Sequence, residues 1–390
     1  MKVLIFMTQF YQLSGAERLA VELAEELNKS GIRADILSMY TEEMPGVEEA
    51  KRALLLKGIP AVHFLGMRIH PPVSSMLPAV MQLRHLLREE KYDIVETSMM
   101  MPAIITSWST MMGVQTRHVV GLHQVFRRDR ENELKHMFFR LTVRRNQLIR
   151  YYSITDYAVA HWITYSKTSP RHIRRIYNAI LDDCFEIRND RELVRKELRI
   201  PEEGKLVIYV GRIAAYKGID TLFDSLGPVC ERHNIYLLYI GLPDHSVNGT
   251  REMIEQIEKR IANEQLGERV KFLGHQKDIP RLMSAADLLA HPTRIEGFGL
   301  TLAEAMAVGL PIVASNVEAI PEVLAGTDSI MVPPDDPEAF QAAVLRTLRR
   351  TPDEAASAIA KGRNRAQDFR ISNRTDAMIQ LFEDVIQGRF

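Results

Sequence analysis

Short apolar runs alternate along the chain with longer stretches in which apolar residues recur every three or four positions. The runs are rich in Val, Ile and Leu and predict buried strands, whereas the longer stretches predict amphipathic helices. Such alternation indicates parallel sheets whose strands are joined by crossover helices. In the first part of the chain, strands are predicted at 3–7, 34–39, 61–65, 93–96, 118–122 and 151–154.

A charged, turn-prone connection over about 178–205 interrupts this pattern, which then resumes. Because 390 residues exceed what one hydrophobic core usually supports, two domains are expected. Each half predicts a doubly wound α/β domain, and the length points to a cleft between them. In the second half, strands are predicted at 206–210, 236–240, 270–273, 287–290, 311–314 and 329–332, and closing helices at 337–350, 353–368 and 373–387.

The composition is that of an ordinary soluble globular protein, with 46% apolar and 26% charged residues. Lys plus Arg and Asp plus Glu both number 50, so nucleic acid is not expected as a partner. Cys184 and Cys230 lie outside any short Cys/His spacing, which indicates neither disulfides nor a zinc motif and favours a reducing cytoplasm. The opening apolar run predicts a buried strand, and no segment approaches the roughly 20 apolar residues of a membrane span.

Ligands of open α/β sheets bind beyond the carboxyl ends of the strands, so the loops there are the first candidates. The loop over 9–18 places Gly15 at a helix entrance, where backbone N–H groups could meet an anion. Ser14 as an ordinary N-cap is an equally good interpretation. The chain lacks both the three-glycine dinucleotide fingerprint and the Gly-x4-Gly-Lys-Ser/Thr phosphate loop, which argues against a dehydrogenase or an ATPase.

A second loop follows the 206–210 strand and carries Gly211, Arg212 and Lys217. A guanidinium can engage two phosphate oxygens while an ammonium supplies a second positive charge, so the pair suits a diphosphate. Two solvated surface cations are the alternative.

The strongest local pattern covers 294–309, where one carboxylate precedes a helix and another lies on its second turn. Two glycines allow close approach to the backbone, and the N–H groups at 299–301 form a positive helix end suited to phosphate. Carboxylates accept hydrogen bonds from pairs of hydroxyls, so we expect Glu296 to face a sugar and Glu304 a ribose. The alternative makes Glu296 a residue that matches the helix dipole and Glu304 a surface glutamate.

These motifs together resemble glycosyltransferase family 4, whose members have the two-domain GT-B fold, over nearly the whole chain. Departures from the family pattern are Ser14 and Ala179, each where a glycine is usual. The resemblance is carried by Glu296 to Glu304 as the Glu-x7-Glu element, Gly211-Arg212 with Lys217-Gly218 as the diphosphate loop, Gly15-Ala16-Glu17 as the N-terminal glycine loop, and Asn178-Ala179-Ile180 at the domain junction.

The resemblance implies a retaining, metal-independent front-face transfer of a hexose, of the glucose or GlcNAc type, from a UDP-sugar. The acceptor would be a carbohydrate, a lipid-linked sugar or a small molecule. No cofactor or metal is expected, and the sequence lacks Asp-x-Asp. Two Rossmann-like domains would face each other across a cleft, 1–177 binding the acceptor and 178–370 the nucleotide sugar, with a helix at about 371–390 packing back on the first.

The resemblance also assigns site residues. His123 would contact the sugar 6-hydroxyl, although a histidine after a strand is more often structural or merely exposed. The predicted catalytic residues are Glu296, Arg212, Lys217 and His123. The predicted donor-binding residues are Gly15, Gly211, Gly297, Phe298, Gly299, Leu300, Thr301, Glu304 and His275.

Two other functions share this architecture or nucleotide site: a UDP-sugar 2-epimerase and a non-catalytic nucleotide-sugar-binding protein.

Residues 117–150 carry nine Arg or Lys against three acids, interleaved with phenylalanines. This pattern is typical of peripheral contact with the inner face of a membrane, but a solvated helix face explains it equally well.

Overall fold

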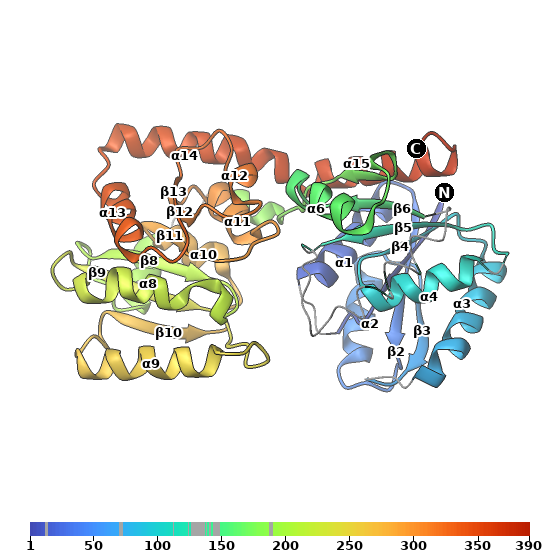
Figure 1. Cartoon of the computed structure of the whole chain (residues 1–390), viewed down its shortest axis with the longest axis horizontal. Coiled ribbons are helices and arrows are strands. Elements are labelled where there is room, and N and C mark those ends of the chain that lie inside the picture. The colour runs from blue at the N-terminus through green and yellow to red at the C-terminus, as the bar shows by residue number, and fades with distance from the viewer. Residues whose placement is uncertain are drawn as a thin grey trace. The chain divides into compact units, whose positions relative to one another are not determined.

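A computed structural model describes residues 1–11, 15–69, 73–111, 113–123, 125, 137, 139, 142, 149–186 and 190–390. The chain forms two compact units, Met1–Ala179 with Ile371–Phe390 and Ile180–Arg370, called here the N unit and the C unit (Figure 1). Each is a parallel sheet with helices on both faces, which confirms the predicted fold class. The sequence had placed the division between residues 177 and 178, two positions earlier.

The sheet of the N unit has the strand order β3-β2-β1-β4-β5-β6-β7, and all of its pairings are parallel. The edge strand β7 was missed because its three residues include two arginines and form no apolar run. The strands are β1 (Lys2–Met7), β2 (Arg33–Tyr40), β3 (Val62–Met67), β4 (Ile94–Thr97), β5 (Arg117–Leu122), β6 (Ile149–Ser153) and β7 (Ile173–Arg175).

Successive side chains of β1 enter two different cores, as expected for a strand covered on both faces. Val3 and Ile5 pack with α1, α2 and α15, whereas Leu4 and Phe6 pack with α3 and α4. The described helices of this unit are α1 (Gly15–Lys29), α2 (Val47–Leu56), α3 (Met76–Glu90), α4 (Met100–Met111), α6 (Asp156–Ser166) and α15 (Ile371–Ile386).

The helix α15 belongs to the N unit although the entire C unit precedes it in the sequence (Figure 1). Its residues Met378, Leu381 and Phe382 are buried in the same core as Leu23 of α1. Arg374 is also buried and donates from Nη1 to the backbone oxygen of Leu19 over 3.2 Å. The core of the N unit is therefore built from α1 and α15, which precede and follow the C unit in the sequence.

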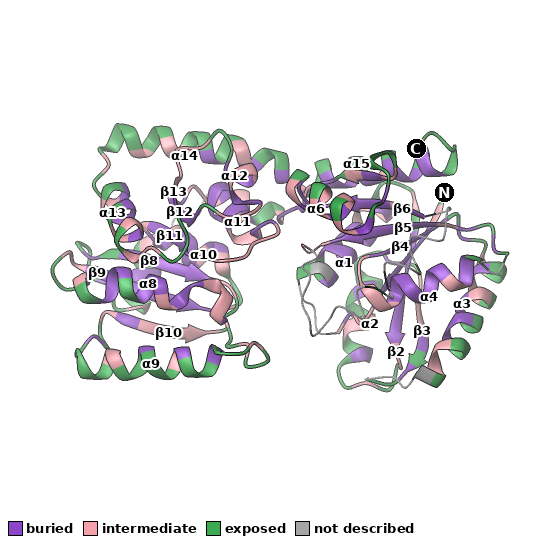
Figure 2. Cartoon of the chain, in the orientation of Figure 1, coloured by how far each residue is buried: buried purple, intermediate pink, exposed green. Residues whose placement is uncertain are grey.

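The C unit contains a parallel sheet with the order β10-β9-β8-β11-β12-β13, whose strands are largely buried between helices with exposed outer sides (Figure 2). Its strands are β8 (Lys205–Val210), β9 (Ile235–Ile240), β10 (Val270–Gly274), β11 (Leu288–His291), β12 (Ile312–Ser315) and β13 (Ile330–Val332). Its helices are α7 (Arg191–Glu197), α8 (Ile219–Leu226), α9 (Thr250–Asn263), α10 (Ile279–Ala285), α11 (Leu300–Val308), α12 (Ile320–Val323), α13 (Pro337–Leu348) and α14 (Pro352–Ala366).

Candidate functional site

Three loops of the C unit leave the carboxyl ends of adjacent strands and meet at one edge of the sheet. One follows β8 and contains the short 3-10 helix Ala215–Lys217, the second joins β11 to α11, and the third follows β12. Because the strands are parallel, all three loops lie at the edge where α/β proteins bind ligands.

The centre of this edge is the Glu296 carboxylate. Its Oε2 lies 2.7 Å from Nζ of Lys217 and 3.1 Å from Nε2 of His291, which ends β11. The side chains of Lys217 and Glu296 are only 13% and 14% exposed. The backbone N–H of Glu296 donates to Oε2 of Glu318 over 2.7 Å. The structure therefore brings together two of the predicted catalytic residues, Lys217 and Glu296.

The neighbours of Glu296 keep it ionised. Burial alone would raise its pKa, but the Lys217 ammonium and the hydrogen bond from His291 outweigh burial and lower that pKa to about 2. Burial lowers the pKa of His291, so its imidazole is neutral at pH 7. A neutral ring that donates from Nε2 to Glu296 carries its lone pair on Nδ1. The carboxylate thus has two fixed donors and a full negative charge.

A pH prediction follows from this pKa. The pKa of Glu296 is lowered from 4.5 to about 2, so its ionised form adds folding stability that is fully present above about pH 4.5. That stability is lost as the pH falls through about 2. Urea midpoints measured between pH 4.5 and 2.5 should fall more steeply for the wild type than for Glu296→Gln. Parallel curves for the two proteins would show that the ion pair does not stabilise the fold.

Arg212 occupies a different position from Lys217. Its Nη1 donates to Oδ2 of Asp244 over 2.9 Å, and its side chain is 66% exposed. The hydroxyl of Tyr209 donates to the backbone oxygen of Arg212 over 2.8 Å, which holds the turn just after Gly211. The two predicted phosphate-binding cations therefore pair with different carboxylates, and the sequence reasoning did not identify Asp244.

The start of α11 has the shape expected of an anion site. Gly299 is the N-cap with a φ of 82°, and the first N–H groups of a helix have no partner within that helix. Leu300 and Thr301 are half-buried at this end, beside Gly297, and Glu304 is half-buried on the next turn. Phe298 is 2% exposed and packs edge-on against Phe369 with ring centroids 5.2 Å apart, so its side chain belongs to the core.

His275 lies apart from this centre in sequence and topology. It is exposed and follows β10, the edge strand of the sheet. Among the described residues, neither a side-chain hydrogen bond nor an ion pair joins His275 to Lys217 or Glu296. Because β10 is parallel to β9, the loop that carries His275 also leaves a carboxyl end of this sheet, and the donor-binding role of His275 stays a prediction.

In the N unit, His123 belongs to a hydrogen-bonded cluster that the sequence reasoning missed. Its Nε2 lies 3.1 Å from Oγ of Ser98 and 3.3 Å from Oη of Tyr152. Both hydroxyls donate to Oε1 of the buried Glu96, over 2.6 and 2.8 Å. Burial lowers the pKa of His123 to about 3, so the ring is neutral, and burial raises the pKa of Glu96. A carboxylate near the carboxyl end of the central strand β4 was the available sequence signal.

Two predictions fall largely outside the described residues. Gly15 is the exposed first residue of α1, but Ser14, the alternative N-cap, lies outside them. Most of the basic segment 117–150 also lies outside them; of its nine cations, only Arg117 and Arg150 are described.

Within the described ranges, no helix combines the length and apolarity needed to cross a bilayer. The same ranges contain no group of three or more His, Cys, Asp or Glu that could hold a metal ion.

Two family models match this chain in succession. The model described as Glycosyltransferase Family 4 matches residues 13–183, and the model described as Glycosyl transferases group 1 matches residues 190–365. Together the two matches cover most of the sequence, and they meet near the division between the N and C units.

Curated relatives are similar over part of the sequence. Lipopolysaccharide glucosyltransferase WaaG of Escherichia coli strain K12 is 27% identical over 222 residues, 55% of this chain and 57% of that protein. D-inositol 3-phosphate glycosyltransferase of Mycobacterium marinum is 28% identical over 236 residues, 60% of this chain and 49% of that protein. The matched segments thus span about half the length of these curated relatives.

The likeness to solved structures extends over the whole chain. HepE of Anabaena is 20% identical with a TM-score of 0.82, and the alignment covers 98% of this chain and 100% of that one. At this level of identity the likeness shows a common fold of two Rossmann-like units.

Proposed function

Because this chain belongs to glycosyltransferase family 4 and has the GT-B fold, we propose that it transfers a hexose from a UDP-sugar to a hydroxyl acceptor. The observation that carries the proposal is the pairing of Lys217 with Glu296 just before the N-terminus of α11. A diphosphate requires positive charge and N–H donors, whereas sugar hydroxyls require an acceptor. The C unit offers all three within neighbouring loops.

Each group has a separate part in donor binding. The Lys217 ammonium has three N–H donors, so it can keep its bond to Glu296 and still donate to a phosphate oxygen. The ion pair of Arg212 with Asp244 involves a largely exposed guanidinium, and such a pair contributes little free energy. A phosphate can therefore recruit Arg212 at small cost, while the helix start supplies backbone N–H groups.

The same groups stabilise the transition state. As the bond from the anomeric carbon to the diphosphate breaks, negative charge grows on the leaving phosphate, facing Lys217, Arg212 and the start of α11. Glu296 remains ionised and holds the sugar through its hydroxyls. In a retaining reaction the acceptor oxygen attacks the face from which the phosphate departs, and the departing phosphate oxygen takes the acceptor proton. This course requires neither a separate enzymatic base nor a metal ion.

The donor is proposed from relatives. HepE was solved with UDP and with UDP-glucose, and WaaG of Escherichia coli is named a glucosyltransferase. These names support UDP as the nucleotide and a hexose of the glucose type as the sugar. Contact of the 117–150 segment with a membrane stays a prediction.

The decisive experiment combines turnover with product stereochemistry. We expect UDP release from UDP-glucose or UDP-GlcNAc that depends on an added acceptor, and an α-linked product by proton NMR. A β-linked product would contradict the front-face course. Conversion of UDP-GlcNAc without any acceptor would identify a 2-epimerase instead, and UDP-sugar binding without UDP release over a broad acceptor pool would identify a binding protein.

A further inference from the structure

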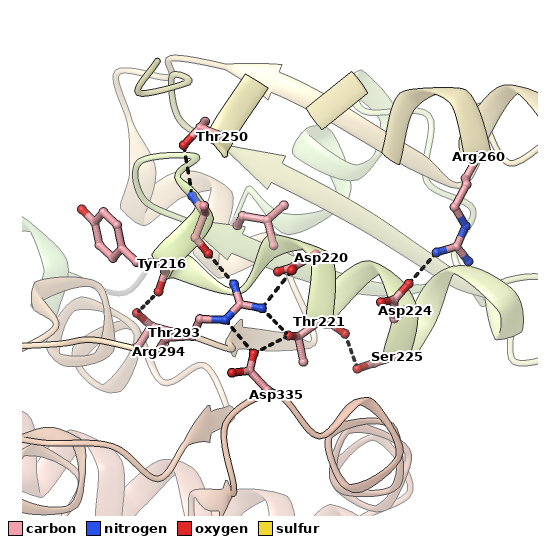
Figure 3. A network of polar contacts seen from close by, with 12 residues as sticks. Tyr216, Asp220, Thr221, Asp224, Ser225, Thr250, Arg260, Thr293, Arg294 and Asp335 are labelled. Atoms are coloured by element: carbon pink, nitrogen blue, oxygen red, sulfur yellow. Dashed lines mark hydrogen bonds and ion pairs between the residues drawn. The ribbon is translucent and has the colours of Figure 1, made fainter. Parts of the chain in front are cut away.

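Arg294 lies two residues before Glu296, and its side chain reaches three other segments of the C unit (Figure 3). Nη1 donates to the backbone oxygen of Ala215. Nη2 donates to Oδ2 of Asp220 over 2.8 Å, and Nε donates to Oδ1 of Asp335 over 2.6 Å. One guanidinium thus connects the loop after β8, the start of α8 and the loop after β13.

Backbone contacts tie the same two loops together. The N–H of Arg294 donates to the backbone oxygen of Tyr216 over 2.9 Å, and the hydroxyl of Thr293 lies 3.4 Å from that oxygen (Figure 3). Arg294 therefore binds the carbonyl oxygens of both residues that precede Lys217. On the other side, the N–H of Ala215 donates to the hydroxyl of Thr250 over 3.1 Å.

The contacts of Arg294 point to a geometric effect rather than a direct charge effect. Its positive charge is balanced by the two carboxylates of Asp220 and Asp335, and its side chain is 28% exposed. The five N–H donors of a guanidinium have a rigid planar arrangement, so bonds to three segments fix the relative positions of those segments. The segment that they fix most directly is 215–217, which ends in Lys217.

We propose that Arg294 is a positioning residue for donor binding, which holds Lys217 beside Glu296 before the donor arrives. The inference rests on the proposed function, in which Lys217 binds the diphosphate. A preformed loop makes binding tighter because no free energy is spent on ordering it when the ligand enters. Arg294 acts through Lys217, so its removal should matter only while Lys217 is present.

A double-mutant cycle with UDP as the ligand tests this coupling. By calorimetry, we expect Arg294→Met to weaken UDP binding about tenfold, and Lys217→Met to weaken it at least as much. Adding Arg294→Met to Lys217→Met should then cause less than a twofold further loss. Losses that multiply in the double variant would overturn the proposal, as would wild-type affinity in Arg294→Met.

Two milder variants separate geometry from charge and guard against misfolding of Arg294→Met. Arg294→Lys keeps the positive charge but cannot reach three segments at once, so it should lose most of the affinity that Arg294→Met loses. Asp220→Asn weakens one of the bonds and should produce a smaller loss in the same direction. Wild-type affinity in Arg294→Lys would show that charge alone matters and would overturn the positioning role.

Amide hydrogen exchange without ligand provides a readout that does not depend on the donor. Arg294→Met should speed exchange in peptides that contain residues 214–218, whereas peptides from β8 and β9 keep their wild-type rates. Faster exchange in a protein that fails to bind UDP would refute the proposed donor and retain the positioning role. Unchanged exchange at 214–218 would overturn the positioning role itself.

Discussion

Replacement of Lys217 by Met lowers the rate of sugar transfer about 10²- to 10³-fold at saturating donor, because one preorganised donor to the leaving phosphate is lost. The Lys217 side chain is 13% exposed and is held beside Glu296, so water cannot readily take the place of the lost N–H donor. Methionine retains most of the volume of the side chain. The measurement is UDP release with the best UDP-sugar and acceptor, together with the thermal midpoint.

The matched control for this variant is Lys361→Met on α14. Lys361 also forms an ion pair, with Asp328 over 2.8 Å, but its side chain is 50% exposed. We expect wild-type turnover from the control and little change in stability. A Lys217→Met protein that is folded and turns over at the wild-type rate would remove Lys217 from the proposed mechanism.

Replacement of Gly218 by Ala destabilises the C unit by about 2 to 4 kcal/mol, because two costs add. Gly218 has a φ of 67°, which a residue with a Cβ atom adopts only under strain. A Cβ atom there would also lie 2.1 Å from the backbone oxygen of Pro292, so the loop that carries Lys217 must separate from the loop that carries Glu296. Urea unfolding followed by circular dichroism measures the loss.

A control separates the strain from the clash. Gly249 has a φ of 80°, but the nearest atom to a Cβ there is 3.8 Å away, so Gly249→Ala should cost only about 1 kcal/mol. Both tryptophans of the chain, Trp108 and Trp162, lie in the N unit, so tryptophan fluorescence follows that unit separately. Equal losses for the two alanine variants would show that the contact with Pro292 is not tight.

The sequence predicted the fold well because strands buried on both faces leave a strong signal. A continuous apolar run such as Leu206 to Val210 is buried on both faces only when its strand lies between two layers of helices. The prediction was weaker at sheet edges, where burial is partial. β7 has only Ile173 buried among its three residues. In the inner strand β12 the predicted start was one residue early, because Pro311 has no N–H to pair.

Part of the candidate site was also accessible from the sequence. Glu296 and Lys217 were recognised from local motifs, and the structure joins them directly. Their neighbours were not recognised. Glu318 reaches the site only once β12 lies beside β11, and His291 lies five residues before Glu296 at the end of a strand, where the sequence does not show which way its ring points. Spacing along the chain contains no information about contacts between separate strands. It also made Arg212 appear equivalent to Lys217, although the two cations pair with different carboxylates.

The return of α15 to the N unit has a consequence for synthesis on the ribosome. Residues 180–370 are made before the helix Ile371–Ile386, so the C unit can finish folding while the N unit still lacks one of its helices. Until then, the side of α1 that later covers Met378 and Leu381 has no partner from that helix. The nascent first unit therefore remains a candidate client for chaperones until the helix Ile371–Ile386 has been synthesised.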